Sequence, residues 1–131
     1  MINVVIGIGS NCGNREDNIR LTLDWLKEIL DNMVSSDIYS SACVGNGRKE
    51  YFNAVVKGMF NGSQENLQLL CKQKELEMGR DEDCRKREDV PVDIDPVIID
   101  GLILKEWDYR QKFFQRGFLQ VSDVKKNELI I

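Results

Sequence analysis

Apolar residues along the chain alternate between two spacings, one typical of strands and one typical of helices. Residues 3–8 are Asn-Val-Val-Ile-Gly-Ile, a mostly apolar stretch that predicts a buried first strand. After a loop of turn residues, apolar positions recur every three or four residues. This second pattern predicts an amphipathic helix that begins at an Asn14 cap and ends near Asn32.

The middle of the chain predicts two more strands and a second helix. Residues 34–43 and 51–60 are apolar enough for strands, and a polar connection over 45–49 joins them. Ser63 is placed to cap a helix with leucines on one side, and Gly79 is placed to end it.

The last third of the chain begins with a run of charge. Nine of the ten side chains in 80–89 are charged, so we expect a mobile loop. The predicted segments after it are, in order, a strand over 92–99, a turn at 100–101, a short strand over 102–104, an irregular or helical stretch over 107–116, and a final or edge strand over 117–121.

This order of elements, β-α-β-β-α-β with additions, predicts an α+β fold. We expect a ferredoxin-like antiparallel sheet with both helices packed on one face. A length of 131 residues suits one domain over 1–131. The sequence has neither an apolar run of membrane-spanning length nor a signal-peptide pattern, so we expect a cytoplasmic protein that contacts no membrane. We also expect a monomer.

Composition narrows the chemistry. The net charge of −4 gives no strong case for nucleic-acid binding, although basic residues cluster near Arg80, over 85–87 and over 110–116. These clusters suit a small anionic ligand, or are a solvated charged surface. The chain has no histidine, which removes the usual general base, and its four cysteines form no Cys-x-x-Cys pair, so a zinc site is not expected.

Two acids occupy alternate positions of the predicted strand over 92–99. Because side chains alternate along a strand, Asp93 and Asp95 point to one face while Val92 and Ile94 point to the other. Their Cα atoms are then about 7 Å apart, close enough to share hard cations such as Mg²⁺. Taken alone, the pair is better explained as two solvated acids on an exposed strand face, and only its surroundings favour a metal site.

Five short motifs follow one another along the chain, spread over roughly residues 3–121. They are Ile-Gly-Ile-Gly-Ser-Asn-Cys-Gly-Asn over 6–14, Tyr-Phe-Asn-Ala-Val over 51–55, Glu-Leu-Glu-Met-Gly-Arg over 75–80, Val-Asp-Ile-Asp over 92–95 and Arg-Gly-Phe over 116–118. In this order and at these separations they resemble the motifs of the 6-hydroxymethyl-7,8-dihydropterin pyrophosphokinase family.

The resemblance implies an activity in folate biosynthesis. Such enzymes transfer the terminal pyrophosphate of ATP to the hydroxymethyl group of 6-hydroxymethyl-7,8-dihydropterin and leave AMP. It implies that Asp93 and Asp95 bind two Mg²⁺ ions that bridge the ATP phosphates, and that Arg80 and Arg116 hold phosphate oxygens. Arg80 after Gly79 can equally be explained as a cation that complements the end of a helix.

The resemblance also implies a pterin site. Asn53 would recognise the pterin edge, Tyr51 and Phe118 would stack on its two faces, and the backbone from Ser41 to Val44 would supply further hydrogen bonds. Tyr51 and Phe118 can each be explained as core residues instead. An asparagine within an apolar strand is harder to explain that way, because a buried amide needs partners.

The chain departs from the family pattern at the nucleotide side. Val90 stands where the family has an arginine, a place that Arg87 or Arg85 can take from the preceding loop. Arg110 stands where the family has a histidine near ATP, and we expect it to bind phosphate. Pro96 follows the second aspartate, which predicts a strand edge there.

These departures leave two alternatives to the enzyme. One is a weakened or inactive paralogue that acts as a pterin- or nucleotide-binding module. The other is an unrelated ferredoxin-like binding domain, which the five ordered motifs argue against.

Overall fold

The computed structural model describes residues 1–41 and 50–122. Our predictions for 42–49 and for the tail lie outside the described residues. The elements are β1 (Ile2–Ser10), α1 (Arg15–Ile29), β2 (Leu30–Ser35), β3 (Tyr39–Ser41), β4 (Tyr51–Phe60), α2 (Gln64–Glu77), α3 (Glu82–Arg87), β5 (Asp93–Ile99), β6 (Leu102–Ile103), α4 (Glu106–Arg110) and α5 (Lys112–Val121).

The strands form one antiparallel sheet in the order β2-β4-β1-β5-β6, with β3 also paired to β4. The predicted α+β class and antiparallel sheet are therefore confirmed. The predicted β-α-β-β-α-β order is present with additions, because β6 and three further helices join it. The second strand is divided into β2 and β3, and just after β2 Ser36 still exchanges hydrogen bonds of 2.8 Å with the backbone of Val55, one through its amide and one through its side chain.

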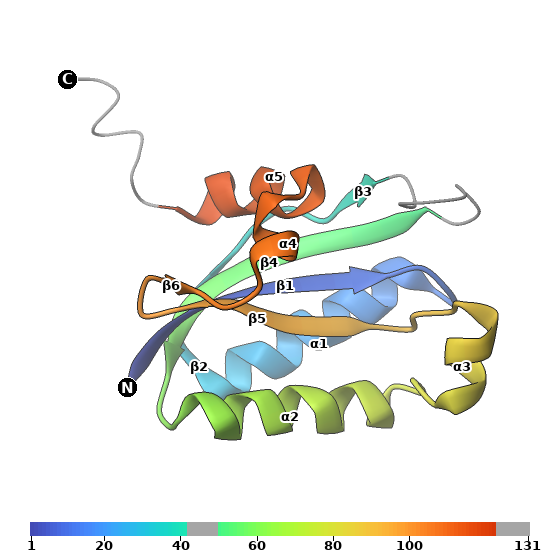
Figure 1. Ribbon diagram of the computed structural model, residues 1–131, viewed down its shortest axis with the longest axis horizontal. Helices are drawn as coiled ribbons and strands as arrows, with labels where there is room; N and C mark the ends of the chain where they lie inside the picture. Colours follow the sequence, from blue (N-terminus) through green and yellow to red (C-terminus); the bar gives the residue numbers. More distant parts are fainter. Residues whose placement is uncertain (42–49, 123–131) are drawn as a thin grey trace.

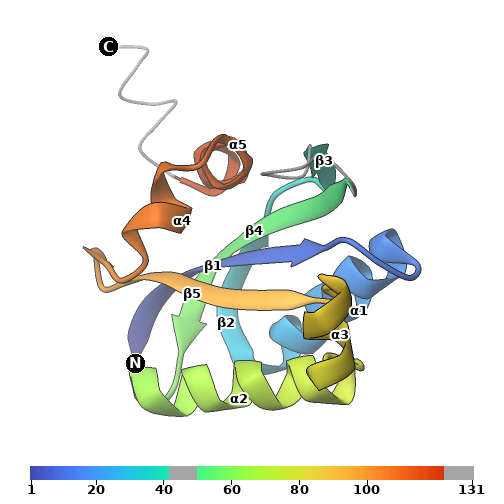
Figure 2. The ribbon, with the colours of Figure 1, turned by 45° about the vertical axis from the view of Figure 1, so that its right-hand side comes forward.

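Helices α1 and α2 cover one face of the sheet, as predicted (Figures 1 and 2). Their caps are those expected from the sequence, since Asn14 accepts a hydrogen bond from the Asp17 amide and Ser63 accepts one from the Asn66 amide. The core between helices and sheet includes Ile6, Ile8, Ile19, Leu26, Leu67 and Ile94. Helix α1 ends at Ile29 rather than near Asn32, because Leu30 already has extended backbone angles and begins β2.

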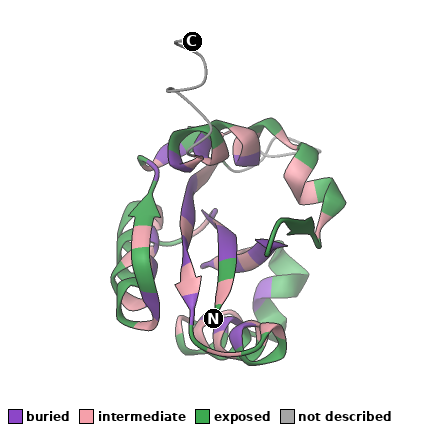
Figure 3. Cartoon of the chain, turned by 90° about the vertical axis from the view of Figure 1, so that its left-hand side faces the viewer, coloured by how far each residue is buried: buried purple, intermediate pink, exposed green. Residues whose placement is uncertain are grey.

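Helices α4 and α5 lie on the opposite face of the sheet (Figure 2). Phe114 and Val121 of α5 pack there against Val55 and Val97 in a second, smaller core. Figure 3 shows buried positions along the strands between these two layers. The predicted strand over 117–121 is wrong, because the apolar positions Phe114 and Val121 are seven residues apart, two helical turns, and so face the sheet together only in a helix.

The charged stretch over 80–89 is not a loop throughout. Residues 82–87 form α3, where the side chain of Asp81 accepts a hydrogen bond from the Cys84 amide at 2.9 Å. Cys84 is buried and anchors this helix against the body of the protein. The prediction of a loop is wrong for residues 82–87. The Asp81 cap and the buried Cys84 are enough to form a short helix there. The mobility of the stretch stays a prediction.

None of the helices within the described part of the chain is both long and apolar enough to cross a membrane.

Candidate active site

Strand β5 carries the two aspartates on one side. Val92 and Ile94 are buried in the main core, whereas Asp93 and Asp95 are partly exposed, which confirms the predicted alternation. Pro96 lies at an irregularity in the pairing of β5 with β1. On its other side β5 pairs with β6 only at Ile98 and Ile99, so the predicted strand edge at Pro96 is also confirmed.

Glu75 of α2 completes a cluster of three carboxyl groups. One oxygen from each of Glu75, Asp93 and Asp95 lies within 4.8 Å of the others. Glu75 is only 5% exposed, and it accepts a hydrogen bond of 2.7 Å from the backbone amide of Ile94. From the sequence, Glu75 can be explained either as a solvated helix residue or as a residue that supports the site from behind, and we did not predict it as a site residue. The available signal was its spacing, four residues after Cys71 and eight after Leu67, which places a charged residue on the buried face of a helix.

Two cations lie against this cluster. The Arg80 guanidinium is 2.8 Å from Asp93 Oδ1 and 3.3 Å from Glu75 Oε2, so the structure places Arg80 where the sequence predicted a site residue. The Lys105 ammonium is 2.6 Å from Asp95 Oδ1. Lys105 was missed, and nothing in its local sequence indicates this contact. Three carboxylates and two cations leave a net negative charge that favours a further cation.

Electrostatics within the cluster act most strongly on Asp95. Burial, and next the neighbouring Asp93, raise the pKa of Asp95 to about 7, although Lys105 pulls it down. Burial lowers the pKa of Arg80, but its hydrogen bond to Asp93 and the charges of Asp93 and Glu75 outweigh burial and raise that pKa. The cluster is a set of hard oxygen donors in a partly buried place, which is the chemistry that fits Mg²⁺.

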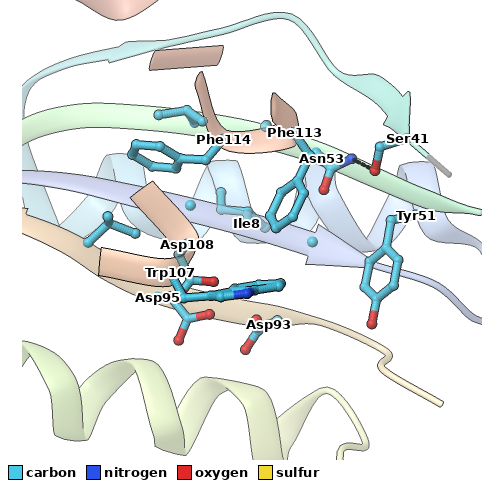
Figure 4. Close-up of a pocket in the computed structure, with 15 residues that line it drawn as sticks. Ile8, Ser41, Tyr51, Asn53, Asp93, Asp95, Trp107, Asp108, Phe113 and Phe114 are labelled. Atoms are coloured by element: carbon cyan, nitrogen blue, oxygen red, sulfur yellow. Dashed lines mark hydrogen bonds between the residues drawn. The ribbon is translucent and has the colours of Figure 1, made fainter. Parts of the chain in front are cut away.

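A cavity of about 200 Å³ opens beside the aspartates on the α4 and α5 side of the sheet. Figure 4 shows Asp93 and Asp95 with Asp108 of α4 along one part of the wall, and Asn53 with Ser41 along another. Its aromatic walls come from three elements and consist of Tyr51, Trp107, Phe113 and Phe114. The structure thus brings the predicted metal-binding aspartates and three of the predicted pterin residues into one cavity.

Asn53 is held firmly in this wall. It is 4% exposed, and its Nδ2 donates a hydrogen bond to Ser41 Oγ at 2.8 Å and a longer one to the Tyr39 carbonyl at 3.5 Å. The structure therefore unites Asn53 with Ser41, both predicted to serve the pterin. Val44, the other predicted backbone contact, lies outside the described residues.

The Arg-Gly-Phe motif lies outside the cavity. Phe118 stacks on Phe114 with ring centroids 5.6 Å apart, and the Arg116 guanidinium lies 4.6 Å from the centre of the Tyr39 ring. Gly117 fits so closely that an added Cβ would be 2.5 Å from Val55 Cγ2 and 2.7 Å from Tyr39 Oη. In this structure the motif fixes α5 to the sheet, and the predicted ligand contacts of Phe118 and Arg116 stay predictions.

The structure also places Arg87 and Arg110 away from the aspartates. Arg87 is paired with Asp89 at 2.9 Å, and Arg110 with Glu106 at 3.2 Å; both arginines are exposed. Neither lines the cavity of the aspartates, so their nucleotide contacts stay predictions as well.

Val90 lies near the cluster. Its backbone is fixed by two hydrogen bonds with Asn11, of 2.9 Å from the Asn11 amide and 2.6 Å to the Asn11 side chain. It lines a second cavity, of about 380 Å³, together with Glu75, Arg80 and Arg85. An arginine side chain at position 90 would therefore begin in a cavity that also reaches the acidic cluster.

We compared the sequence with models of known protein families. The model of the family described as 7,8-dihydro-6-hydroxymethylpterin-pyrophosphokinase (HPPK) matches residues 5–123. A search of curated proteins found no match. The family transfers pyrophosphate from ATP to hydroxymethyldihydropterin in folate synthesis, and it uses ATP and Mg²⁺. Because the match spans nearly all of the chain, the protein belongs to the HPPK family.

Proposed function

We propose that this chain is an active, Mg²⁺-dependent pyrophosphokinase. Its substrates would be ATP and 6-hydroxymethyl-7,8-dihydropterin, and its products AMP and the pterin diphosphate. The observation that carries the proposal is the single cavity that contains both the acidic pair of β5 and the amide of Asn53. A transfer between two substrates requires that their reacting groups be bound side by side, and this cavity offers a place for each.

Asp93 and Asp95 are the residues that would hold Mg²⁺, two ions by the resemblance. When bound, the metal neutralises phosphate charge, which is the main need of phosphoryl-type transfer. Glu75 would position the two aspartates, because the hydrogen bond that it accepts from the Ile94 amide fixes the backbone between them. The buried carboxylate thereby sets the direction in which both acids point.

Arg80 would bind a phosphate oxygen as the nucleotide enters. Its guanidinium already lies beside Asp93, and it offers more donors than its two carboxylate partners use. Arg116, Arg110 and Arg87 are exposed, so their long side chains are able to turn toward a bound triphosphate.

The pterin would lie toward Asn53 and Tyr51. Ser41 accepts a hydrogen bond from Asn53 Nδ2 and so fixes the amide plane that would meet the pterin edge. This places the recognising amide and the metal-binding acids at different parts of the same wall (Figure 4). The pterin would then span the cavity, with its hydroxymethyl group toward the acids.

The second candidate is a pterin- or nucleotide-binding module without turnover. It is favoured by Val90, which has no charge to offer a phosphate, and by the position of Arg116 over the Tyr39 ring rather than in the cavity. Both candidates predict ligand binding, and only the enzyme predicts AMP.

Calorimetry with a non-hydrolysable ATP analogue tests the metal site. We expect binding that requires Mg²⁺, and we expect Asp93→Asn and Asp95→Asn to abolish that requirement together with most of the affinity. Asp24→Asn, on the exposed side of α1, is the matched control and should bind as the natural protein does. Unchanged Mg²⁺-dependent affinity in both site variants would remove Asp93 and Asp95 from the metal site.

A further inference from the structure

Asp108 is a third aspartate in the wall of the cavity that contains Asp93 and Asp95. It belongs to α4, is partly buried, and lies at the same part of the wall as the two acids of β5 (Figure 4). Burial, and next the charge of Asp95, raise the pKa of Asp108, so these two carboxyl groups are near enough to interact. All three carboxyl groups therefore lie around one region of the cavity.

The surroundings of Asp108 differ from those of the other two aspartates. Asp93 and Asp95 each have a cation as partner, at 2.8 Å and 2.6 Å. The carboxyl group of Asp108 forms neither a hydrogen bond nor an ion pair with the residues that the structure describes. It also lies outside the cluster of Glu75, Asp93 and Asp95, whose oxygens are within 4.8 Å of one another. Asp108 is thus a partly buried carboxyl group that the acidic cluster does not use.

The proposed reaction requires a group that accepts a proton. The hydroxymethyl oxygen of the pterin forms a bond to the β-phosphorus of ATP. The bond from that phosphorus to the oxygen shared with the α-phosphate breaks, and this oxygen leaves with AMP and the electron pair. The proton of the hydroxyl group must then pass to a base.

Few groups of this chain are suited to be that base. The chain has no histidine, which is the commonest general base in enzymes. Asp93 and Asp95 are the residues that hold metal ions in the proposed function, so their lone pairs are committed. Among the described residues that line the cavity, Asp108 is the carboxyl group that is left.

We propose that Asp108 binds the hydroxyl of the pterin hydroxymethyl group and accepts its proton as the oxygen–phosphorus bond forms. The inference rests on the proposed function, which places the pterin edge at Asn53 and the hydroxymethyl group toward the acids. A carboxylate is a strong acceptor for a hydroxyl hydrogen bond, and this bond directs a lone pair of the oxygen toward the phosphorus. Because Asp108 is also partly exposed, the proton can pass from it to water.

Calorimetry with two pterins tests the hydrogen bond. Hydroxymethyldihydropterin and 6-methyl-7,8-dihydropterin, which lacks the hydroxyl, are titrated into protein saturated with Mg²⁺ and the ATP analogue. We expect the natural protein to bind the hydroxymethyl compound about tenfold more tightly, and Asp108→Ala to bind both compounds equally within about twofold. The affinity for the 6-methyl compound should be the same in both proteins within about twofold, because the contacts of the ring are unchanged.

A single-turnover measurement of AMP formation tests the transfer of the proton. Asp108→Asn keeps the size of the side chain and an acceptor oxygen but is not a base, so its rate should fall by about 100-fold or more. Its affinity for the hydroxymethyl compound should fall less than about threefold. Its urea midpoint should not fall, since the carboxyl group has no hydrogen bond to lose among the described residues. Asp24→Asn, the same change at an exposed position of α1, should match the natural protein in rate and affinity.

Three results would overturn the inference. A rate within about threefold of the natural one in Asp108→Asn, with the preference for the hydroxyl retained in Asp108→Ala, would exclude Asp108 while leaving the proposed function intact. A slow rate in both variants with that preference retained would mean that Asp108 acts on the nucleotide instead. Failure of the natural protein to bind the pterin or to form AMP would overturn the proposed function and the inference with it.

Discussion

Replacement of Asp95 by asparagine should stabilise the metal-free protein at alkaline pH. Asp95 is an acid whose pKa is raised, from 3.8 to about 7, so its folded form binds a proton more tightly than its unfolded form. Its contribution therefore favours folding below about pH 4, and stability falls as the pH rises toward 7. Above pH 7 the folded protein carries the full penalty of a partly buried carboxylate beside Asp93.

The size of the effect follows from the shift. Three pKa units correspond to about 4 kcal/mol, a net figure that already includes the opposing pull of Lys105, and it is an upper limit because solvent screens these partly exposed groups. We expect Asp95→Asn to be more stable than the natural protein by about 2 kcal/mol at pH 8, and by less at pH 5.

Urea unfolding in the presence of a chelator, at pH 5 and pH 8, measures this difference. Asp24→Asn is the control and should follow the natural protein at both values. Addition of Mg²⁺ at pH 8 should then stabilise the natural protein and leave Asp95→Asn unchanged. A variant that is less stable than the natural protein at pH 8 would refute the reasoning, because it would mean that the ion pair outweighs the strain between the acids.

Three further predictions concern ligands. Asn53→Ala should weaken pterin binding by about 1–3 kcal/mol and ATP-analogue binding far less, as measured by calorimetry, because polar groups of the bound pterin lose their hydrogen-bonding partner. Equal losses for both ligands would mean that Asn53 has a structural role. Val90→Arg should raise steady-state AMP production by about one to two decades, because it adds a charge-assisted phosphate contact from a backbone that Asn11 already fixes; no gain, together with strong impairment in Arg87→Ala, would show that Arg87 already fills the place. Backbone amides over 80–89 should exchange more slowly with solvent when ATP analogue and pterin are both bound, and identical exchange in free and bound protein would contradict closure of this stretch.

Helix caps and the spacing of apolar residues predicted most of the sheet and the two helices α1 and α2 that cover one of its faces. Asn14 and Ser63 cap their helices as expected because a cap depends on three or four neighbouring residues. The placement of Asp93 and Asp95 on one face was also predictable, because side chains two residues apart in any strand point to the same face. The error at α5 arose where apolar residues are frequent enough to fit both spacings, and packing against Val55 decided for the helix.

The missed site residues depend on contacts across the fold. Glu75 is 18 residues from Asp93 along the chain, and only the packing of α2 beside β5 unites them. Lys105 and Trp107 reach the site because the turn after β5 brings α4 back over the sheet. No spacing within the sequence encodes that return, whereas a charged residue on the buried face of α2 gave a signal that could have been used.

Product analysis tests the central claim most directly. ATP, Mg²⁺ and 6-hydroxymethyl-7,8-dihydropterin are incubated with the natural protein and with Asp93→Asn, and the phosphorus species are followed by nuclear magnetic resonance. The account predicts AMP and pterin diphosphate in equal amounts from the natural protein, and neither from the variant. Formation of ADP, or pterin binding without any AMP, would contradict it.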